Sequence, residues 1–442
     1  MASTLSTYRS VIALTGPFLP VLSFFARLPV AMSQFGSVLL VSETSGSLAT
    51  AGIVGGCLSA GQVVFGPVLG RLADRHGQRP VVLAAAAVNA VATAALVAGA
   101  LTGLGTAVLA AVGAVAGASV PLIGPLARTR SVALAHRARA GEGVVGAVHS
   151  LEGTLDEVSF VFGPALVGLA ALALHPAVAL GGAAALVAVF GTAYALHPTA
   201  AVTAASPARA RAEGVRAPRR PRVAQPRVVH AVRASLALQG AMFGACQAGI
   251  ASLTARLGVP GQAGIVYAAM GVVSAAVGLA LGALPARFGL RLRWRVATGA
   301  ALVLSVPLLF TQTLWPLYAV VTVLGAAYAP HLITAFALTE RVVAPSRLAE
   351  SMAFAASALV AGQAAALAVS GRLAEAHGPV GAFAVAVGAA ALCLATALVT
   401  RVPSARPPAP AAEPARAFIP AQRTGSVEGR GAPGGAAGYA GR

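Results

Sequence analysis

The stretch from Gly66 to Leu83 reads GPVLGRLADRHGQRPVVL and separates two long apolar runs. The first run ends near Leu69, and the second begins at Pro80 and continues to Ala100. Each run is long enough to cross a bilayer, which takes about 20 apolar residues. The polar residues between them must therefore form a tight turn at one membrane surface, where the arginines face the lipid headgroups.

Residues Gly70 to Arg79, which we call the signature loop, carry the chemistry of this turn. Gly70 and Gly77 permit close helix approach and unusual backbone angles. Asp74 is an acceptor-only anion among cations, which suits a nearby helix N-terminus or an arginine. The loop resembles the G-x-L-a-D-R-x-G-R-[KR] signature that follows the second transmembrane helix of the major facilitator superfamily. Gln78 stands where an arginine is usual, and the matching residues are Gly70, Leu72, Ala73, Asp74, Arg75, Gly77 and Arg79.

The resemblance implies a partner for this loop. In the superfamily, the aspartate contacts the cytoplasmic end of helix eleven and holds the two halves together in the outward-facing state. In this chain that end begins near Ser346, a suitable N-cap residue. We expect Asp74 to accept from the amides that follow, and Arg75 or Arg79 to pair with Glu350.

The composition of the whole chain agrees with a membrane protein. Hydrophobic residues make up 57% of the chain and charged residues 10%, against roughly 25% charged residues in soluble domains. The net charge of +19 could indicate nucleic-acid binding, but no aromatic-studded basic module is present. We expect the arginines to face anionic lipid headgroups instead. Cys57, Cys246 and Cys393 have no metal-ligand spacing, so we expect no metal site. No nucleophile–base set is recognisable in the sequence either, so we expect no enzyme activity and no cofactor.

Twelve apolar stretches predict an all-α, polytopic membrane protein with twelve transmembrane helices. The resemblance implies two pseudo-symmetric six-helix bundles. We predict a first bundle over 1–197, a cytoplasmic Arg/Pro-rich linker over 198–228, a second bundle over 229–400 and a disordered cytoplasmic tail over 401–442. The predicted spans are Val11–Leu40, Leu48–Leu69, Pro80–Ala100, Gly105–Leu126, Gly143–Leu174, Ala177–Leu196, Val229–Ala255, Ala263–Leu284, Val296–Thr311, Leu314–Leu338, Ala349–Gly371 and Pro379–Thr400.

The arginines predict the orientation of the chain in the membrane. With both termini in the cytoplasm, nearly all arginines lie in cytoplasmic loops or tails, as the positive-inside rule requires. The exceptions are Arg256 and Arg372, which would be external, and Arg27, which would lie within the membrane. We therefore predict a multi-pass protein of the cytoplasmic membrane, and we expect it to be a monomer.

Ionisable groups within the spans are candidates for function, because each costs about 2.5–3.5 kcal/mol to insert near mid-bilayer. Arg27 lies midway along span one. In span five, His149, Glu152 and Asp156 are spaced i, i+3, i+7 and share one helix face. Glu157 points about 100° away from Asp156.

Two interpretations of these groups remain open at this point, and they are compatible. Arg27 could form a structural ion pair with one carboxylate of span five and lock helices one and five together. Alternatively, at least one acid serves proton or cation coupling, because three acids face one arginine and one would be left unpaired. We expect Asp156 to be the proton site, and Glu157 to serve helix packing or the pair with Arg27.

Span five continues with Gly163, Pro164 and Gly168, which resemble the Gly-Pro motif of drug–proton antiporters in the superfamily. The likeness is partial, since Val167 replaces one glycine and Ser159 stands where an upstream glycine is usual. The resemblance implies export, and the alternative is a kink with close helix packing.

Span four departs from the antiporters in a way that matters for coupling. Those proteins usually carry an arginine there, whereas Gly105 to Leu126 contains no charged residue. We therefore do not expect their proton mechanism to apply unchanged.

In the superfamily, helices one, four, seven and ten line the central cavity. Few charges are expected there in this chain, which favours a small, amphiphilic or zwitterionic solute over a phosphate or polyanion. The polar residues on these helices that could line the cavity are Gln34, Gln239, Gln247, Tyr328 and His331. Any of them could instead form a hydrogen bond with a neighbouring helix.

Together these features predict a secondary active transporter that moves a small amphiphilic solute by alternating access, with proton-coupled export as the preferred mode. The alternative within transport is a proton-coupled importer of a small nutrient. The alternative from another class is a transporter-like receptor or assembly protein that does not transport.

Overall fold

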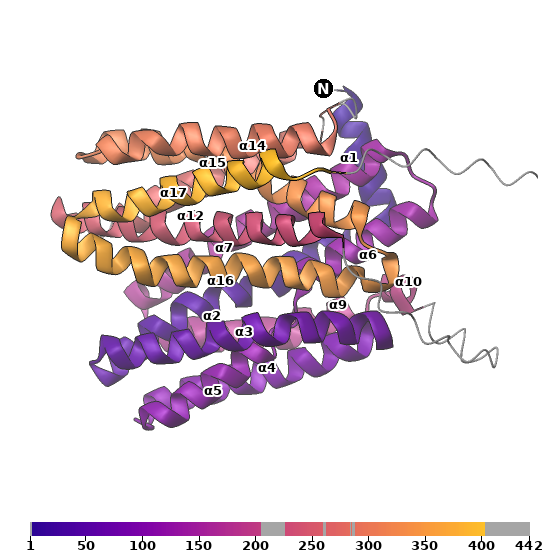
Figure 1. Ribbon diagram of the computed structural model, residues 1–442. Coiled ribbons are helices and arrows are strands. Elements are labelled where there is room, and N and C mark those ends of the chain that lie inside the picture. The colour runs from indigo at the N-terminus through magenta and orange to yellow at the C-terminus, as the bar shows by residue number, and fades with distance from the viewer. Residues whose placement is uncertain (1, 205–225, 260–261, 283, 285–287, 403–442) are drawn as a thin grey trace, which may run out of the picture. The chain divides into compact units, whose positions relative to one another are not determined.

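The computed structural model describes residues 2–204, 226–259, 262–282, 284 and 288–402, and the secondary structure within these ranges is helical. Twelve spans in this part of the chain are long and apolar enough to cross a membrane, which confirms the predicted number. Figure 1 shows the long helices running side by side along a common direction.

Each half of the chain supplies six of these spans. The helices of the N-terminal half are α1 (Ala2–Thr15), α2 (Phe18–Ser45), α3 (Leu48–His76), α4 (Gln78–Leu101), α5 (Thr106–Ala118), α6 (Ile123–Arg137), α7 (Glu142–Ala173), α8 (Pro176–Leu186), η1 (Val187–Gly191), α9 (Thr192–Leu196), η2 (Pro198–Ala200) and α10 (Ala201–Ala204). Those of the C-terminal half are α12 (Arg227–Arg256), α13 (Gln262–Leu281), α14 (Leu290–Ser305), η3 (Val306–Phe310), α15 (Leu314–Val342), η4 (Pro345–Arg347), α16 (Leu348–His377) and α17 (Pro379–Val399).

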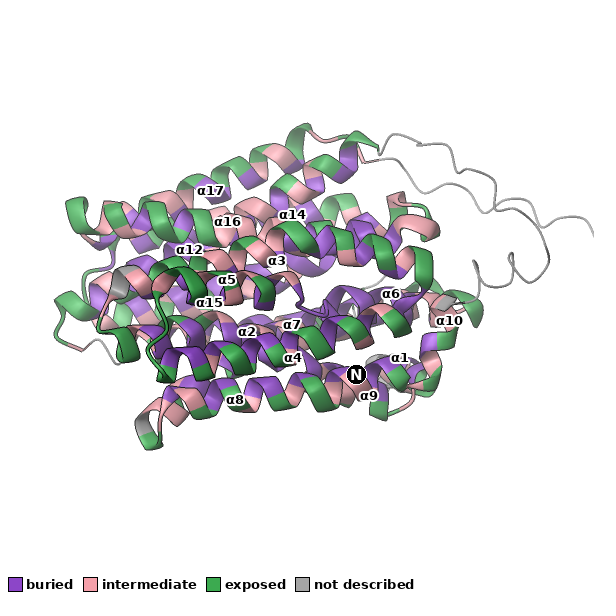
Figure 2. Ribbon diagram, turned by 90° about the horizontal axis from the view of Figure 1, so that it is seen from below, coloured by how far each residue is buried: buried purple, intermediate pink, exposed green. Residues whose placement is uncertain are grey.

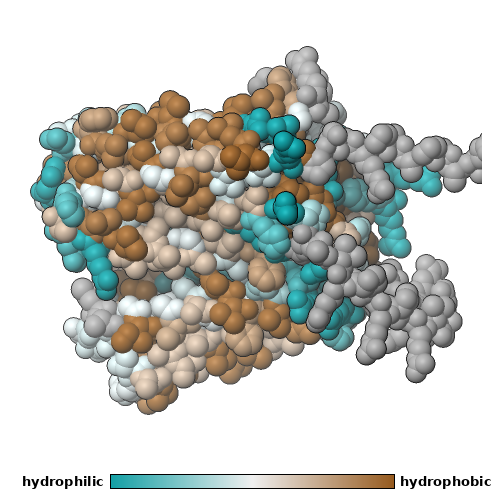
Figure 3. Space-filling view, in the orientation of Figure 1, coloured by the Kyte–Doolittle hydropathy of each residue, from teal (hydrophilic) through white to brown (hydrophobic). Residues whose placement is uncertain are grey.

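The outer faces of the helices are apolar. Large side chains such as Val64, Leu169 and Trp315 are exposed there, at 63%, 64% and 80%. Figure 3 shows this apolar surface in brown, with hydrophilic residues gathered at the two ends of the helices, and Figure 2 shows that the buried residues lie on the faces turned towards other helices. This distribution matches lipid tails around the middle of the molecule and water at both ends.

The first predicted span is two helices rather than one. α1 ends at Thr15, Gly16 adopts a φ of +75°, and α2 begins after Pro17. A left-handed glycine terminates a helix, and the proline that follows favours the start of the next one. The prediction of a single span over Val11–Leu40 is therefore wrong, and α1 precedes the first membrane-crossing helix.

The signature loop is mostly helical. α3 continues to His76, and α4 begins at Gln78, so the chain reverses at Gly77 alone. Gly77 has a φ of +85°, which side chains with a Cβ rarely adopt. The predicted ten-residue turn is thus a single-residue turn at the end of a longer helix.

The fourth span extends well beyond its predicted end at Leu126. It runs from Thr106 to Arg137, with a break before α6 at Leu122, whose φ is +51°. Arg128 and Arg130 are fully buried on α6. The prediction that this span contains no charged residue is therefore wrong. The span continues past the apolar run into helical turns with polar residues, and packing against other helices buries those turns.

The predicted linker and tail lie largely outside the described residues. Of the linker 198–228, the structure describes η2, α10 and the start of α12, and of the tail 401–442 it describes only 401 and 402.

The two halves pack most extensively along two helix pairs, α3 with α16 and α7 with α13. Small residues permit the close approach at the first pair. A Cβ placed on Gly70 would lie 2.7 Å from the carbonyl oxygen of Ala349 and equally close to the Cβ of Ala353. A larger residue at position 70 would force α3 and α16 apart.

Candidate functional site

An ion cluster connects three helices of the N-terminal half, and we use this name for Arg27, Arg128, Glu152 and Asp156. Arg27 on α2 forms ion pairs with Glu152 and Asp156 of α7, and its Nη1 lies 3.2 Å from Asp156 Oδ1. Arg128 on α6 pairs with the other oxygen of Asp156 at 3.0 Å. The hydroxyl of Ser131 donates to Glu152 Oε1 at 2.9 Å. Both guanidinium groups and Glu152 are almost completely buried.

The helix period explains this arrangement. Glu152 and Asp156 are four residues apart and therefore share one face of α7. Arg27 lies opposite them and bonds both, so the predicted pair with span five is present with two partners instead of one. In an interior of low permittivity, removal of one member would leave an uncompensated charge, which typically destabilises a protein by about 3–5 kcal/mol.

Arg128 was not among the site residues predicted from the sequence. Its side chain contacts the C-terminal half as well as α7. Its guanidinium carbon lies 3.8 Å from the centre of the Phe336 ring on α15. The signal that could have identified it is the absence of a helix stop, since no glycine or proline occurs between Leu126 and Gly141. A helix that continues through this segment carries Arg128 inwards to α7.

Arg130 is held by neutral groups in a second network. Its Nε donates to Gln78 Oε1 and its Nη1 to the carbonyl oxygen of Tyr194, both at 2.9 Å, and its guanidinium lies 3.9 Å from the centre of the Tyr194 ring. Gln78 Nε2 in turn donates to the Leu126 carbonyl oxygen and the Thr129 hydroxyl. Gln78 thus ties α4 to α6 within the N-terminal half, while no described carboxylate forms an ion pair with Arg130.

The other two candidates of span five do not join the ion cluster. His149 is buried, and neither ring nitrogen has a hydrogen-bond partner among the described residues. Glu157 is 7% exposed and faces Ser274 on α13, in the C-terminal half. Its predicted alternative pairing with Arg27 is not formed, because the two acids at 156 and 157 point to different sides of α7.

Asp74 caps helix α16 from a neighbouring helix. Its Oδ1 accepts from the amide of Ala349 at 3.1 Å, and its Oδ2 accepts from the amide of Glu350 at 2.8 Å. The N-cap position of α16 is Arg347 rather than the predicted Ser346, and no side-chain hydrogen bond from that position caps the helix. The contact implied by the superfamily resemblance is therefore present, and Asp74 supplies the capping acceptor.

Glu350 pairs with different arginines from those predicted. Arg71 Nη2 lies 2.6 Å from Glu350 Oε1, and Arg347 Nε lies 3.3 Å from Oε2. Arg75 and Arg79 are exposed, and neither forms an ion pair with a described acid. Because α3 stays helical here, Arg71 lies one turn before Asp74, beside the first turn of α16, whereas Arg75 lies one turn further on, next to the end of α3 at His76.

The Gly-Pro motif lies where α7 crosses α2. Pro164 is inside α7, and a Cβ on Gly163 would lie 3.1 Å from the backbone nitrogen of Met32. A Cβ on Gly168 would meet open space. Close helix packing therefore accounts for Gly163, and not for Gly168.

Four of the five cavity candidates bond a neighbouring helix. Gln247 is the exception, being partly exposed on α12 with no hydrogen bond to a described residue. The bonded groups are Gln34 with Gln62, Gln239 with the Tyr328 carbonyl, the Tyr328 hydroxyl with Cys246, and His331 with Ser235. The structure thus brings Gln239, Tyr328 and His331 together between α12 and α15, and leaves Gln34 in the other half.

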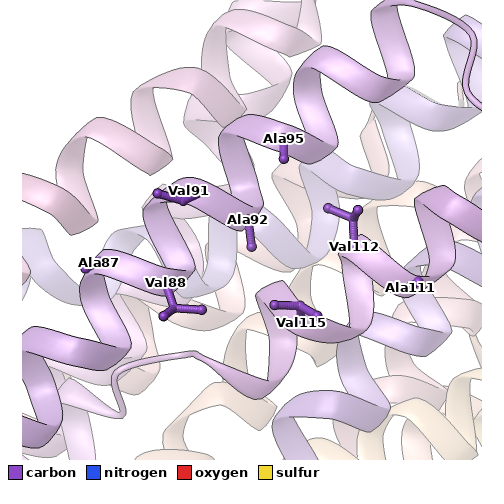
Figure 4. Close-up of a pocket in the computed structure, with 8 residues that line it drawn as sticks. All are labelled: Ala87, Val88, Val91, Ala92, Ala95, Ala111, Val112 and Val115. Atoms are coloured by element: carbon purple, nitrogen blue, oxygen red, sulfur yellow. The ribbon is translucent and has the colours of Figure 1, made fainter.

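A groove of about 520 Å³ lies on the outer surface between α4 and α5. Figure 4 shows that only alanine and valine side chains line it. They are Ala87, Val88, Val91, Ala92, Ala95, Ala111, Val112 and Val115. Such a groove offers no polar contact to orient a solute, so it does not qualify as the transport site.

Sequence comparison assigns a family to most of the chain. The model of the Major Facilitator Superfamily matches residues 14–321 and 262–431. No curated protein matches the sequence.

Solved structures of low sequence identity share the fold. The human organic anion transporter MFSD10 (TETRAN) is 16% identical, with 88% of this chain and 99% of that chain covered and a TM-score of 0.66. The proton:xylose symporter XylE is 12% identical, with coverages of 85% and 94% and a TM-score of 0.64. The transporter FucP in its outward conformation is 15% identical, with coverages of 87% and 98% and a TM-score of 0.61.

Proposed function

This chain belongs to the major facilitator superfamily of secondary transporters, and we propose that it exports a small amphiphilic solute in exchange for protons. The observation that carries the proposal is the ion cluster. Four charged groups are held inside the N-terminal half, and Arg128 also touches Phe336 of the C-terminal half. Charged groups at membrane depth are rare and typically serve ion pathways or coupling, because their insertion is unfavourable.

Hydrogen bonds and ion pairs join the two halves at the end of the molecule where the signature loop lies. They include the contacts of Asp74 and Arg71 with α16 and a 3.5 Å pair between His136 and Glu340. We infer that this end is cytoplasmic, since the arginine distribution favours that orientation. The described conformation is then closed to the cytoplasm, and Asp74 and Arg71 stabilise this outward-facing state.

Export is preferred over import because of the partial Gly-Pro motif at Gly163, Pro164 and Gly168. The solute class is less constrained, since one structural neighbour carries organic anions and another carries xylose with protons. We propose a small amphiphilic solute because the candidate cavity residues between α12 and α15 are neutral. A proton-coupled importer is the alternative within the family, and a receptor or assembly protein without transport is the alternative outside it.

We further propose that the protein resides in the cytoplasmic membrane as a monomer, with both termini in the cytoplasm. The arginine-rich linker and tail would contact anionic headgroups, each arginine near the surface contributing about 1 kcal/mol.

Reconstitution into liposomes tests the transport proposal. Ethidium and fluorescein serve as cationic and anionic amphiphilic probes, and an enclosed pH-sensitive dye reports proton movement. We expect wild-type protein to accumulate a probe against its gradient with a matching pH change. The double variant Arg128→Gln/Asp156→Asn, which removes one cation and one anion of the ion cluster at constant net charge, should insert normally but lose gradient-driven accumulation. Solute movement without any pH change would contradict proton coupling, and equal accumulation by the double variant would contradict a role for the ion cluster.

A further inference from the structure

The face that α7 turns towards the C-terminal half is separate from the face that holds the ion cluster. α7 and α13 run antiparallel and pack closely where α13 carries glycine. A Cβ on Gly271 would meet the side chain of Val161, and a Cβ on Gly278 would lie 3.0 Å from the hydroxyl of Thr154. Thr154 and Val161 are seven residues apart, so they mark one line along α7.

Glu157 lies on this line, three residues after Thr154 and four before Val161. It therefore faces α13 between the two glycine contacts, opposite Ser274. A carboxyl group is thus buried in the contact between the two halves of the transporter. This contact must break if the two halves are to separate at the signature-loop end of the molecule.

Glu157 differs from the other buried acids of the spans in its partners. Glu152 and Asp156 pair with Arg27, and Glu350 pairs with Arg71, whereas Glu157 forms no ion pair with any described residue. The titratable and charged groups around it are Tyr267 on α13, Tyr328 on α15, Cys246 beside them on α12 and Asp156 on α7 itself. None of these groups is a cation.

We propose that Glu157 carries the coupling proton and that its protonated form holds α7 against α13 at the interface between the halves. The first part rests on the proton-coupled transport proposed above, whereas the second does not depend on it. A neutral carboxyl group can stay in this interface and share a hydrogen bond with Ser274. An unpaired carboxylate cannot stay there without a large desolvation penalty.

Deprotonation therefore favours separation of the halves. The O–H bond of Glu157 breaks, the proton passes to water, and the carboxylate that remains is stable only when water reaches it. Rebinding of a proton restores the buried contact. The equilibrium between the closed and open forms must then depend on pH, because the two forms bind different numbers of protons.

This assignment departs from the sequence-based expectation that Asp156 binds the proton. Asp156 lies 3.2 Å from Arg27 Nη1 and 3.0 Å from Arg128 Nη2. A proton on Asp156 would weaken both ion pairs inside one half, and it would affect the other half only through Arg128, which touches Phe336. Glu157 is the acid whose charge opposes the contact that must open.

We call the contact of protonated Glu157 with α13 the latch. A distance measurement between spin labels tests it without substrate or gradient. Labels are attached to His76→Cys at the end of α3 and Arg341→Cys at the end of α15, both exposed, in full-length protein whose native cysteines are replaced. We expect the long-distance population to grow about fivefold to tenfold between about pH 6 and about pH 8.5. Glu157→Gln and Glu157→Leu should both remain in the short-distance form throughout this range. Glu43→Gln, at an exposed acid, is the matched control and should respond as the parent does.

A parent protein without a pH response, or a Glu157→Gln variant that opens as the parent does, would overturn the latch. A short-distance peak of unchanged width shows that each variant is folded. In liposomes, Glu157→Gln should still exchange solute downhill, with no solute-induced pH change. Normal proton movement in that variant would place the coupling proton elsewhere. Absence of any solute movement in wild-type protein would contradict the transport proposal alone, because the distance measurement needs no solute.

Discussion

Gln78 shows at the level of a single residue why this chain departs from the signature of its superfamily. An arginine is usual at this position, but the Gln78 side chain accepts from Arg130 and donates to Leu126 and Thr129. A second guanidinium could not accept a hydrogen bond, since arginine has no acceptor atom. Glutamine in place of arginine at position 78 therefore supplies the acceptor that the buried Arg130 needs.

We predict that Gln78→Arg destabilises the protein by about 3 kcal/mol, because it places two buried cations together and removes an acceptor. The measurement is thermal unfolding of the purified protein in detergent, with a clearly lower midpoint expected. Arg79→Gln, at the exposed next position, is the control and should leave the midpoint nearly unchanged. A Gln78→Arg variant as stable as the parent would show that Arg130 does not depend on this acceptor.

At the scale of helices, α1 contacts both halves of the molecule. Val11 packs in a buried cluster with Val132 of α6 and Val148 of α7, all within the N-terminal half. The hydroxyl of Tyr8 donates to the carbonyl oxygen of Leu279 on α13 at 2.6 Å. Burial raises the pKa of Tyr8, so the hydroxyl keeps the proton that it donates. Figure 1 shows α1 beside the ends of α6 and α7 at the N-terminus of the chain.

We expect Tyr8→Phe to loosen this bridge, because one hydrogen bond between the halves is lost and about 1 kcal/mol of stabilisation with it. Hydrogen–deuterium exchange of the first helix should then become roughly fivefold faster. Ser10→Ala is the matched control, since Ser10 bonds only the Ser6 carbonyl within α1 among the described residues. Equal exchange in Tyr8→Phe and the parent would mean that packing of Val11 alone holds α1 in place.

At the scale of the whole molecule, the orientation in the membrane follows from charge outside the bundle. Arg128 and Arg130 are buried and so do not count as loop residues, but the remaining arginines of the loops and termini still favour one side. The predicted orientation therefore stays the same when Arg128 and Arg130 are assigned to the fourth span.

We predict that single cysteines at Ser45 and Gly261 are external and that cysteines at Ala212 and Ala432 are cytoplasmic. A membrane-impermeant maleimide applied to intact cells should label the first two and spare the others until the cells are opened. Positions 212, 261 and 432 lie outside the described residues, so this experiment depends on topology alone. Labelling of position 212 in intact cells would reverse the proposed orientation.

The sequence by itself determined the number of spans, because a run of about 20 apolar residues is long enough to cross a bilayer. It also identified Arg27 and the acids of span five as groups that need partners, since a buried charge is costly when unpaired. The contact of Asp74 with helix eleven came from the resemblance of the signature loop, and the pairing of Arg27 with span five was one of two open interpretations. The requirements for apolar length and for a partner are local, because they can be identified from residue types and spacing along the chain.

Only the tertiary structure decided which residues those local requirements bring together. Arg128 and Arg130 are buried because α6 continues beyond the apolar run and packs against α7 and α9. Arg71 replaces Arg75 at Glu350 because α3 remains helical to His76. Glu157 faces the other half because Gly271 and Gly278 on α13 allow α7 to pack closely along the side that carries Thr154 and Val161. In each case the outcome depends on where a helix ends and on which helix lies opposite, and neither is set by neighbours in the sequence.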